Sequence, residues 1–160
     1  MFKQKHIIVI RIFLLFFAAA FTLLIFLSLN YQKTKPETLG EEVALKIGAA
    51  QIYAEIADAN EEIVQGLSNR TTLEENSGMY FVLEKREIAM FWMKDMLFSL
   101  DIIWIDDGKI VGIVKETPTP SDKDIPTYTS PGPVTHVLEV NAGFAKEHDI
   151  KIGDRVEVVN

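Results

Sequence analysis

Two charged residues, Lys94 and Asp101, stand inside the most apolar stretch of the chain beyond residue 30, which runs from Phe91 to Asp106. A carboxylate in a dry interior is costly unless it gains a partner or stays protonated. Lys94 is the nearest candidate in the sequence, because the short link of residues 95–99 would fold two strands back on each other. We therefore expect the two side chains to meet. This contact would be either a structural ion pair or part of a functional pocket, because charged groups in an apolar setting also form functional sites. A simpler alternative is that Asp101 only caps the turn.

A strand from Leu100 to Ile105 must position Asp101. Successive residues of a strand face opposite sides, so one face carries Leu100, Ile102 and Trp104. Asp101 lies on the other face, with Ile103 and Ile105. Both faces are mostly apolar, which is typical of a strand buried on both sides. The predicted core of the central hairpin comprises Trp92, Met93, Leu100, Ile102, Ile103 and Ile105.

Further polar side chains are candidates for the same pocket. They are Asp95 and Glu139, whose carboxyl groups could converge with Asp101 in the fold, together with Arg70 and Trp92. An enzyme would then use Lys94 with Asp101 or Glu139, and two nearby acids are also the apparatus of glycoside hydrolysis. A serine hydrolase is not favoured. The Gly-x-Ser-x-Gly elbow is absent, and His136 and Glu139, three residues apart on a strand, face opposite sides.

The methionines suggest a second kind of site. Met79, Met90, Met93 and Met96, with Trp92 and His136, are a soft ligand set that would suit Cu(I). Strand parity separates Met93 from Met90 and Met96, and methionine commonly fills gaps in a core. We therefore expect core packing and no bound cofactor.

The rest of the chain predicts a mainly β domain of sandwich or barrel type with one or two short helices. Asn60 is a candidate N-cap with two acids after it, which predicts a helix over residues 61–69. A second short helix is expected over residues 142–148. Strands are expected over residues 43–47, 51–57, 79–83, 91–96, 100–105, 109–115, 134–140 and 155–159. Residues 116–133 hold five of the six prolines and predict a long irregular loop, either functional or disordered.

The N-terminal segment predicts a membrane anchor. Residues 12–29 are apolar except for Thr22 and Ser28. As a helix, this segment is long enough to cover most of a hydrocarbon core about 30 Å thick. The exit at Ser28–Tyr31 is a poor signal-peptidase site, although a cleaved signal peptide and a secreted domain remain the alternative. Basic residues before the run place the N-terminus in the cytoplasm. We expect a single-pass protein of the cell membrane. Residues 1–30 would form a cytoplasmic stub and the anchor, residues 31–42 a tether, and residues 43–160 the external domain.

Charge limits the partners. The chain has a net charge of −7, but its first 36 residues hold five basic side chains and no acid, so the remainder holds 11 basic and 23 acidic side chains, a net −12. Such a domain repels phosphate, so we expect no nucleic acid partner. Cysteine is absent, which excludes disulfides and thiolate sites.

Several motifs in order resemble one family. Gly66-Leu67 with Arg70, Gly78-Met79-Tyr80-Phe81, Phe91 to Asp95, Leu100 to Ile103, Val137-Leu138-Glu139 and Ala142-Gly143 are similar to the domain-of-unknown-function-192 family over about residues 43–159. The resemblance implies a compact β-rich fold, often on an exported or membrane-anchored chain, and no activity. The family usually has Met at Ser68, Asn and Thr at Asp95 and Met96, and Pro at Ser99, so any site near that turn is altered here.

Three functions remain open at this point. A non-catalytic binding module for a cell-envelope polymer or protein comes first. An enzyme built on Lys94, Asp101 and Glu139 comes second, and a soft-metal carrier third. The sequence does not identify the ligand.

Overall fold

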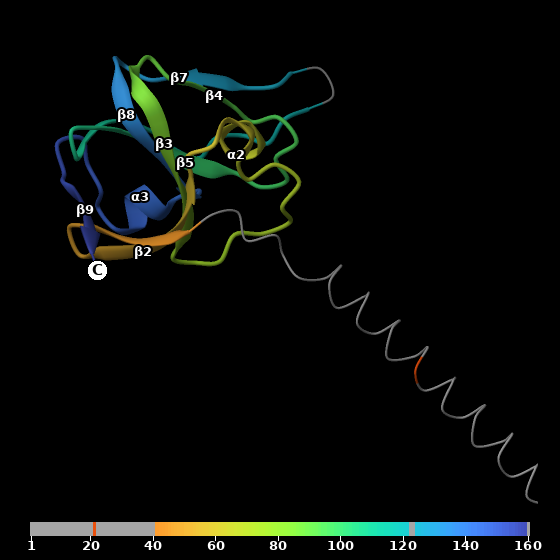
Figure 1. Ribbon diagram of the computed structural model, residues 1–160, viewed down its shortest axis with the longest axis horizontal. Coiled ribbons are helices and arrows are strands. Elements are labelled where there is room, and N and C mark those ends of the chain that lie inside the picture. Colours follow the sequence, from red (N-terminus) through yellow and green to blue (C-terminus); the bar gives the residue numbers. More distant parts are fainter. Residues whose placement is uncertain (1–20, 22–40, 122–123, 160) are drawn as a thin grey trace, which may run out of the picture. The chain divides into compact units, whose positions relative to one another are not determined.

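The computed structural model describes residues 21, 41–121 and 124–159 (Figure 1). The predicted membrane anchor and nearly all of the predicted tether lie outside these residues. Among the described residues, no helix combines the length and the apolar character needed to cross a membrane. The described residues beyond Thr38 belong to one compact unit.

The described part of this unit contains nine strands and two short helices. In chain order they are β1 (Glu42–Ile47), β2 (Ala50–Ala57), α2 (Asn60–Gln65), β3 (Ser77–Glu87), β4 (Met90–Trp92), β5 (Leu100–Asp106), β6 (Lys109–Val114), β7 (Thr127–Thr129), β8 (Val134–Asn141), α3 (Phe144–Glu147) and β9 (Val156–Val159). The mainly β prediction, with two short helices, is confirmed for this part of the chain.

Seven strands form one curled sheet in the order β6-β5-β8-β3-β2-β1-β9, and β4 and β7 form a separate two-stranded ribbon. The β2–β3 pair is parallel, and the other strand pairs are antiparallel. The curl brings the two edges together at one end. The Ile110 N–H donates to the Asp154 carbonyl at 2.9 Å, and the Val156 N–H to the Gly108 carbonyl at 3.0 Å. The sheet is therefore a half-barrel.

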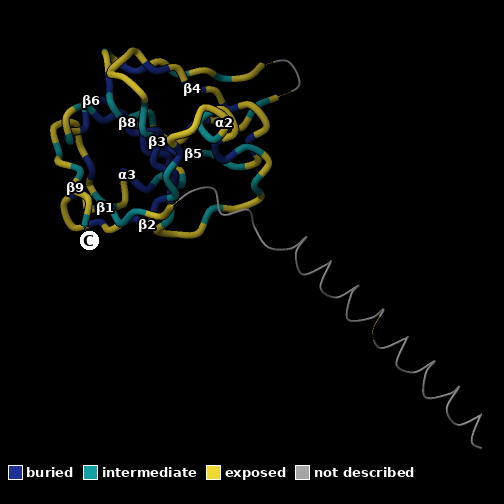
Figure 2. Tube along the Cα trace, in the orientation of Figure 1, coloured by how far each residue is buried: buried dark blue, intermediate teal, exposed yellow. Residues whose placement is uncertain are grey.

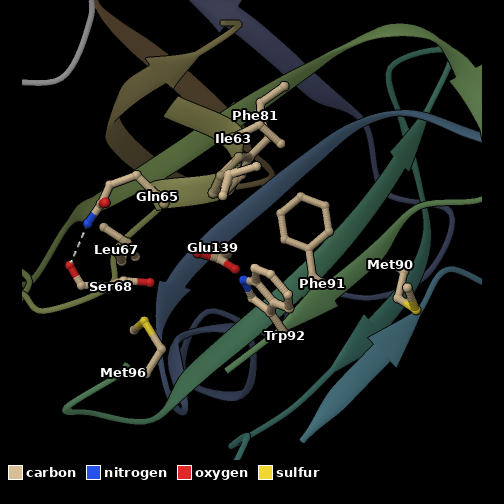
Figure 3. Close-up of a pocket in the computed structure, with 12 residues that line it drawn as sticks. Ile63, Gln65, Leu67, Ser68, Phe81, Met90, Phe91, Trp92, Met96 and Glu139 are labelled. Carbon is tan, nitrogen blue, oxygen red and sulfur yellow. Dashed lines mark hydrogen bonds between the residues drawn. The ribbon is translucent and has the colours of Figure 1, made fainter. Parts of the chain in front are cut away.

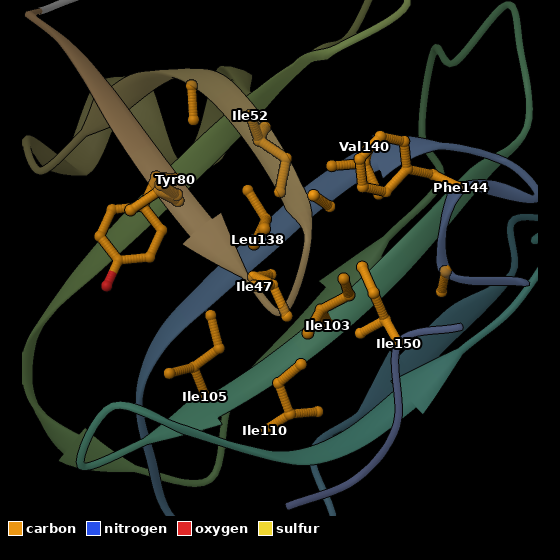
Figure 4. Close-up of a cluster of buried hydrophobic side chains, with 14 residues drawn as sticks. Ile47, Ile52, Tyr80, Ile103, Ile105, Ile110, Leu138, Val140, Phe144 and Ile150 are labelled. Carbon is orange, nitrogen blue, oxygen red and sulfur yellow. The ribbon is translucent and has the colours of Figure 1, made fainter. Parts of the chain in front are cut away.

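The central strands are largely buried, dark blue in Figure 2, and in β5 consecutive residues on both faces are buried. An inner core lies inside the curl, where α3 contributes Phe144 and Ala145 (Figure 4). The inner core also holds Ile103, Ile105 and Leu138. An outer core lies on the opposite face, and its largest members are Met79, Phe81, Phe91, Met93, Leu100, Ile102 and Trp104. The prediction that residues 100–105 are buried on both sides is confirmed.

The predicted central hairpin is wrong. β4 ends at Trp92 and pairs with β7, whereas β5 pairs with β6 and β8 along its two edges. The chain leaves the extended conformation near Asp95, whose φ of 57° is left-handed, a conformation that Asp and Asn tolerate better than most residues. Trp92 is consequently 49% exposed instead of lying in the core, while the other five predicted core residues are buried.

The first helix is shorter than predicted, because Gly66 (φ 48°) follows Gln65 and ends α2. Asn60 is not its N-cap. The Glu62 side chain instead accepts hydrogen bonds from the N–H groups of Asp58 and Ala59, each at 3.2 Å.

A strand also forms within the proline-rich segment, where an irregular loop was predicted. β7 lies between Pro126 and Pro131 and reaches only three residues. Pro126 has no N–H to donate, but its carbonyl still accepts a hydrogen bond from the Met93 N–H at 2.9 Å. Proline is therefore compatible with the position just before β7.

Candidate functional site

Asp101 is a structural residue of the inner face. It is fully buried, and its carboxylate accepts three backbone hydrogen bonds. Oδ1 accepts from Glu116 at 2.8 Å and from Gly143 at 3.1 Å, and Oδ2 accepts from Ala145 at 2.9 Å. The side chain therefore ties the segment after β6 and the start of α3 to β5. Its donors lie outside the turn of residues 95–99, so the expectation that Asp101 only caps that turn is wrong.

Lys94 does not meet Asp101, so the predicted ion pair is wrong. The Lys94 side chain is 52% exposed, and its Nζ lies 4.0 Å from Asp95 and 5.7 Å from the centroid of the Trp92 ring. The reason is that the strand ends at Trp92 and the backbone turns at Asp95, so the alternation of side chains does not continue from β4 into β5. In the described part of the chain, Asp101 has backbone partners alone.

Arg70 and Asp95 frame the loop that follows α2. The Arg70 guanidinium pairs with both oxygens of Glu55, one of them at 2.7 Å, and this contact raises the pKa of Arg70. The Asn69 N–H donates to the Asp95 carbonyl at 2.8 Å, and the Ser68 hydroxyl donates to the Lys94 carbonyl at 2.9 Å. These contacts hold the loop after α2 against the turn after β4.

Glu139 lies on the other face of the sheet from Asp101. In β8 it is flanked by Met79 of β3 and Ile102 of β5, both buried. Its exposed fraction is 5%, and desolvation raises the pKa of its carboxyl group to about 8. Among the described residues, none donates a hydrogen bond to this carboxyl group. No fully enclosed side-chain oxygen of the described residues lacks a partner, so the Glu139 oxygens are open to the space beside them. Glu139 is thus a buried acid that faces a cavity.

That cavity has a volume of about 230 Å³ and lies between α2 and β4 (Figure 3). Its walls come from α2 and the loop after it, from β3, and from the β4 segment. The lining residues are Ile63, Val64, Gln65, Gly66, Leu67, Ser68, Phe81, Met90, Phe91, Trp92, Met96 and Glu139. It is an apolar pocket with one titratable side chain, and we call it the Glu139 pocket.

Close approach of β3 to β8 sets the position of Glu139. A Cβ atom at Gly78 would lie only 2.7 Å from the Glu139 carbonyl oxygen, so the glycine leaves the room that this pairing needs. The Phe81 and Phe91 rings, which also line the pocket, pack edge to face with centroids 4.8 Å apart. The pocket is therefore built from paired strands and packed rings.

The predicted three-residue site of Lys94, Asp101 and Glu139 is not assembled. Asp101 and Glu139 lie on opposite faces of the sheet, since Asp101 stands opposite Val140 and Glu139 opposite Ile102. Of the predicted candidates, Trp92 and Glu139 come together, and both line the pocket. Arg70, Lys94 and Asp95 are not among its lining residues.

The methionines do not gather around the histidine. Met79, Met93 and Met96 are buried in the outer core, while Met90 is 72% exposed. His136 stacks on Tyr80 with ring centroids 4.9 Å apart, and Tyr80 belongs to the inner core. Strand parity places His136 on the face opposite Glu139. The geometry favours core packing over a soft-metal ligand set.

Sequence reasoning missed most of the pocket walls. Phe81, Phe91 and Leu67 are apolar residues of ordinary pattern, and nothing in their spacing marks them as ligand-facing. One signal was present: Glu139 interrupts the apolar run of β8 in the same way that Asp101 interrupts β5.

Comparison with known proteins agrees with this fold. A crystal structure of a candidate transcription regulator from Sinorhizobium meliloti is similar with a TM-score of 0.70 and 29% identity, covering 76% of this chain and 97% of that chain. A protein of unknown function from Novosphingobium aromaticivorans has a TM-score of 0.71 and 30% identity, covering 77% of this chain and 89% of that chain. No curated protein matches.

The match covers 97% of the Sinorhizobium chain, and residues 38–160 of this chain form one compact unit, so residues 38–160 are a suitable isolated domain for experiments. The DUF192 family pattern, described as uncharacterized ACR, matches residues 43–158. The chain belongs to the DUF192 family, as its motifs predicted.

Proposed function

We propose that the external domain is a non-catalytic binding module and that the Glu139 pocket is its binding site. One observation carries the proposal: a buried carboxyl group that no described residue pairs faces an apolar cavity. Ligand pockets are typically apolar, with a few polar groups that fix the ligand's orientation. Glu139 is suited to that role.

The mouth of the pocket supports this reading. Val64, Met90 and Trp92 line it and remain 62%, 72% and 49% exposed. Single exposed apolar side chains are common on any protein surface. Three of them around one cavity form a patch of the kind that marks binding sites.

The pocket chemistry favours binding over catalysis. Glu139 is the one titratable group among the lining residues, and the Ser68 hydroxyl already donates to a backbone carbonyl. Acid–base or nucleophilic mechanisms usually need a second positioned group within hydrogen-bonding reach of the first.

We also propose that the domain is held outside the cell membrane by residues 12–29, where it meets an envelope polymer or protein. The apolar run and the basic residues before it support this location. Membrane fractionation with mass spectrometry of the mature N-terminus tests it. We expect the uncleaved chain in the membrane fraction. A mature chain that starts near Tyr31 would show a secreted domain instead.

Binding in the pocket is tested by NMR titration of the isolated domain with 1-hexanol, n-hexylammonium and hexanoate. We expect the Trp92 indole and the amides of residues 63–68 to shift with at least one probe, because these groups line the cavity.

Ser68→Met, which places the larger side chain usual in the family against the cavity, should abolish the shifts. Val158→Met, a substitution at an exposed position on β9, is the matched control and should retain them. An absence of pocket shifts with all three probes, or their persistence in Ser68→Met, contradicts the proposal.

A further inference from the structure

The ligand class follows from the carboxyl group in the pocket. We infer that the Glu139 pocket binds a small organic cation, an ammonium group on a short apolar chain, with the ammonium against the Glu139 carboxylate and the chain against the apolar walls. This inference rests on the proposed binding function and names the ligand of the same site.

Desolvation of Glu139 is the first argument. Its side chain lies between Met79 and Ile102, and burial makes the bare carboxylate unfavourable. An ammonium group restores a counter-charge and donates charge-assisted hydrogen bonds, which are the stronger kind. An anionic ligand would be repelled wherever the carboxyl group is ionised, and a neutral apolar ligand would leave the group protonated. A cation is therefore the ligand that uses this residue.

Aromatic rings supply the second argument. Phe81, Phe91 and Trp92 all line the cavity, and Figure 3 shows the Trp92 indole and the Glu139 carboxyl turned toward the same space. Aromatic faces attract cations, and Trp does so most strongly. The Trp92 ring already has one cation near it, since Lys94 Nζ lies 5.7 Å from its centroid. The combination of a carboxylate with aromatic walls matches an ammonium group.

Surrounding charge points the same way. The chain beyond residue 36 has a net charge of −12, a field that concentrates cations near the surface. The elements packed around Glu139 are α2 with its following loop, β3, β5 and the β4 segment. Beyond the lining residues, the nearest charged side chains on the turn after β4 are Lys94 and Asp95, each about half exposed. Burial, more than a neighbouring charge, controls the protonation of Glu139.

Size limits the ligand. The cavity of about 230 Å³ is larger than an engineered cavity of roughly 150 Å³ that accepts benzene. A short alkylammonium ion fits this space, whereas a polymer could place only one side group in it.

Calorimetric titration of the isolated domain with n-hexylammonium and with 1-hexanol, its neutral counterpart of equal chain length, tests the inference. At pH 9 we expect the ammonium ion to bind at least tenfold more tightly than the alcohol. Between pH 9 and pH 6 this preference should shrink, because Glu139 takes up a proton while the amine, like a lysine, stays charged. Glu139→Gln should remove the preference at pH 9, and Glu84→Gln, which removes an exposed carboxylate from β3, should keep it.

The outcomes separate the two claims. Equal affinity for the alcohol and the ammonium ion in the parent domain overturns the cation inference and leaves the pocket as a binding site. A preference that persists in Glu139→Gln, or that does not change with pH in the parent, also overturns it, because general surface charge would then explain the binding. Absence of binding by both probes overturns the cation inference, and absence of binding by hexanoate as well contradicts the proposed function.

Discussion

Replacing Asp101 by Ala is expected to lower the free energy of unfolding by about 3 kcal/mol or more. Three backbone N–H groups lose their acceptor, the one of Ala145 in a buried hydrogen bond and those of Glu116 and Gly143 in part-buried ones. Each buried donor left unsatisfied costs roughly 1–3 kcal/mol. Asp101→Asn keeps the shape of the side chain but turns an amide N–H₂ toward one of these donors, so it should also destabilise strongly. Urea unfolding of the isolated domain, followed by circular dichroism, measures both effects.

Lys94→Met is the matched control for Asp101. Because the Lys94 side chain is half exposed and its nearest carboxylate is 4.0 Å away on Asp95, its removal should change stability by less than about 0.5 kcal/mol. The double variant with Asp101→Ala should be as unstable as Asp101→Ala alone. Recovery of stability in the double variant would mean that the two charges interact, which would contradict the assignment of Asp101 to backbone capping.

The second large effect is the pH dependence of stability that Glu139 imposes. The carboxyl pKa is about 8 in the folded domain and 4.5 for an ordinary Glu, so between these pH values the folded state holds a proton that the unfolded chain has lost. Stability therefore falls as pH rises from about 4.5 to about 8. The full contribution is on the order of 5 kcal/mol, at about 1.36 kcal/mol per pKa unit.

Urea unfolding at pH 5, 7 and 9 measures this slope. Glu139→Gln carries no titrating group at the site, so its stability should decline much less over the same range. Glu84→Gln, at an exposed position of the same sheet, should follow the parent. Equal pH dependence in the parent and in Glu139→Gln would show that Glu139 is already ionised at low pH, and the description of its environment would be wrong.

The burial of Asp101 was predictable from sequence, whereas its partners were not. Alternation over Leu100 to Ile105 is a local pattern and correctly placed Asp101 on a dry face. The three donors lie 15, 42 and 44 residues away in the sequence. They are backbone groups, which carry no residue signature, so the nearest lysine looked like the best partner.

Trp92 shows where strand periodicity fails. Its parity with Lys94 and Met96 holds only while the strand continues, and the left-handed Asp95 ends that continuity. The β4 pairing also depends on β7, a strand inside a proline-rich segment where the local pattern predicts none. Long-range pairing of two three-residue strands leaves almost no trace in sequence.

Glu139 was a sequence candidate, but its pocket was not predictable. The pocket needs α2, β3 and the β4–β7 ribbon to meet over β8, and their apolar residues read as ordinary core. The apolar stripe of α2 was visible in the sequence. That Ile63 and Val64 would line a cavity, instead of filling it, depends on packing across segments far apart in the chain.

The claim that Glu139 is a buried carboxyl facing a ligand pocket is tested most directly by carbon-13 NMR titration of its side-chain carboxyl in the isolated domain. We predict a pKa of about 8, because burial disfavours the charged form. Saturating n-hexylammonium should lower this pKa, since the bound cation stabilises the carboxylate. A Glu139 pKa near the ordinary 4.5 that does not respond to the ammonium ion would contradict the claim.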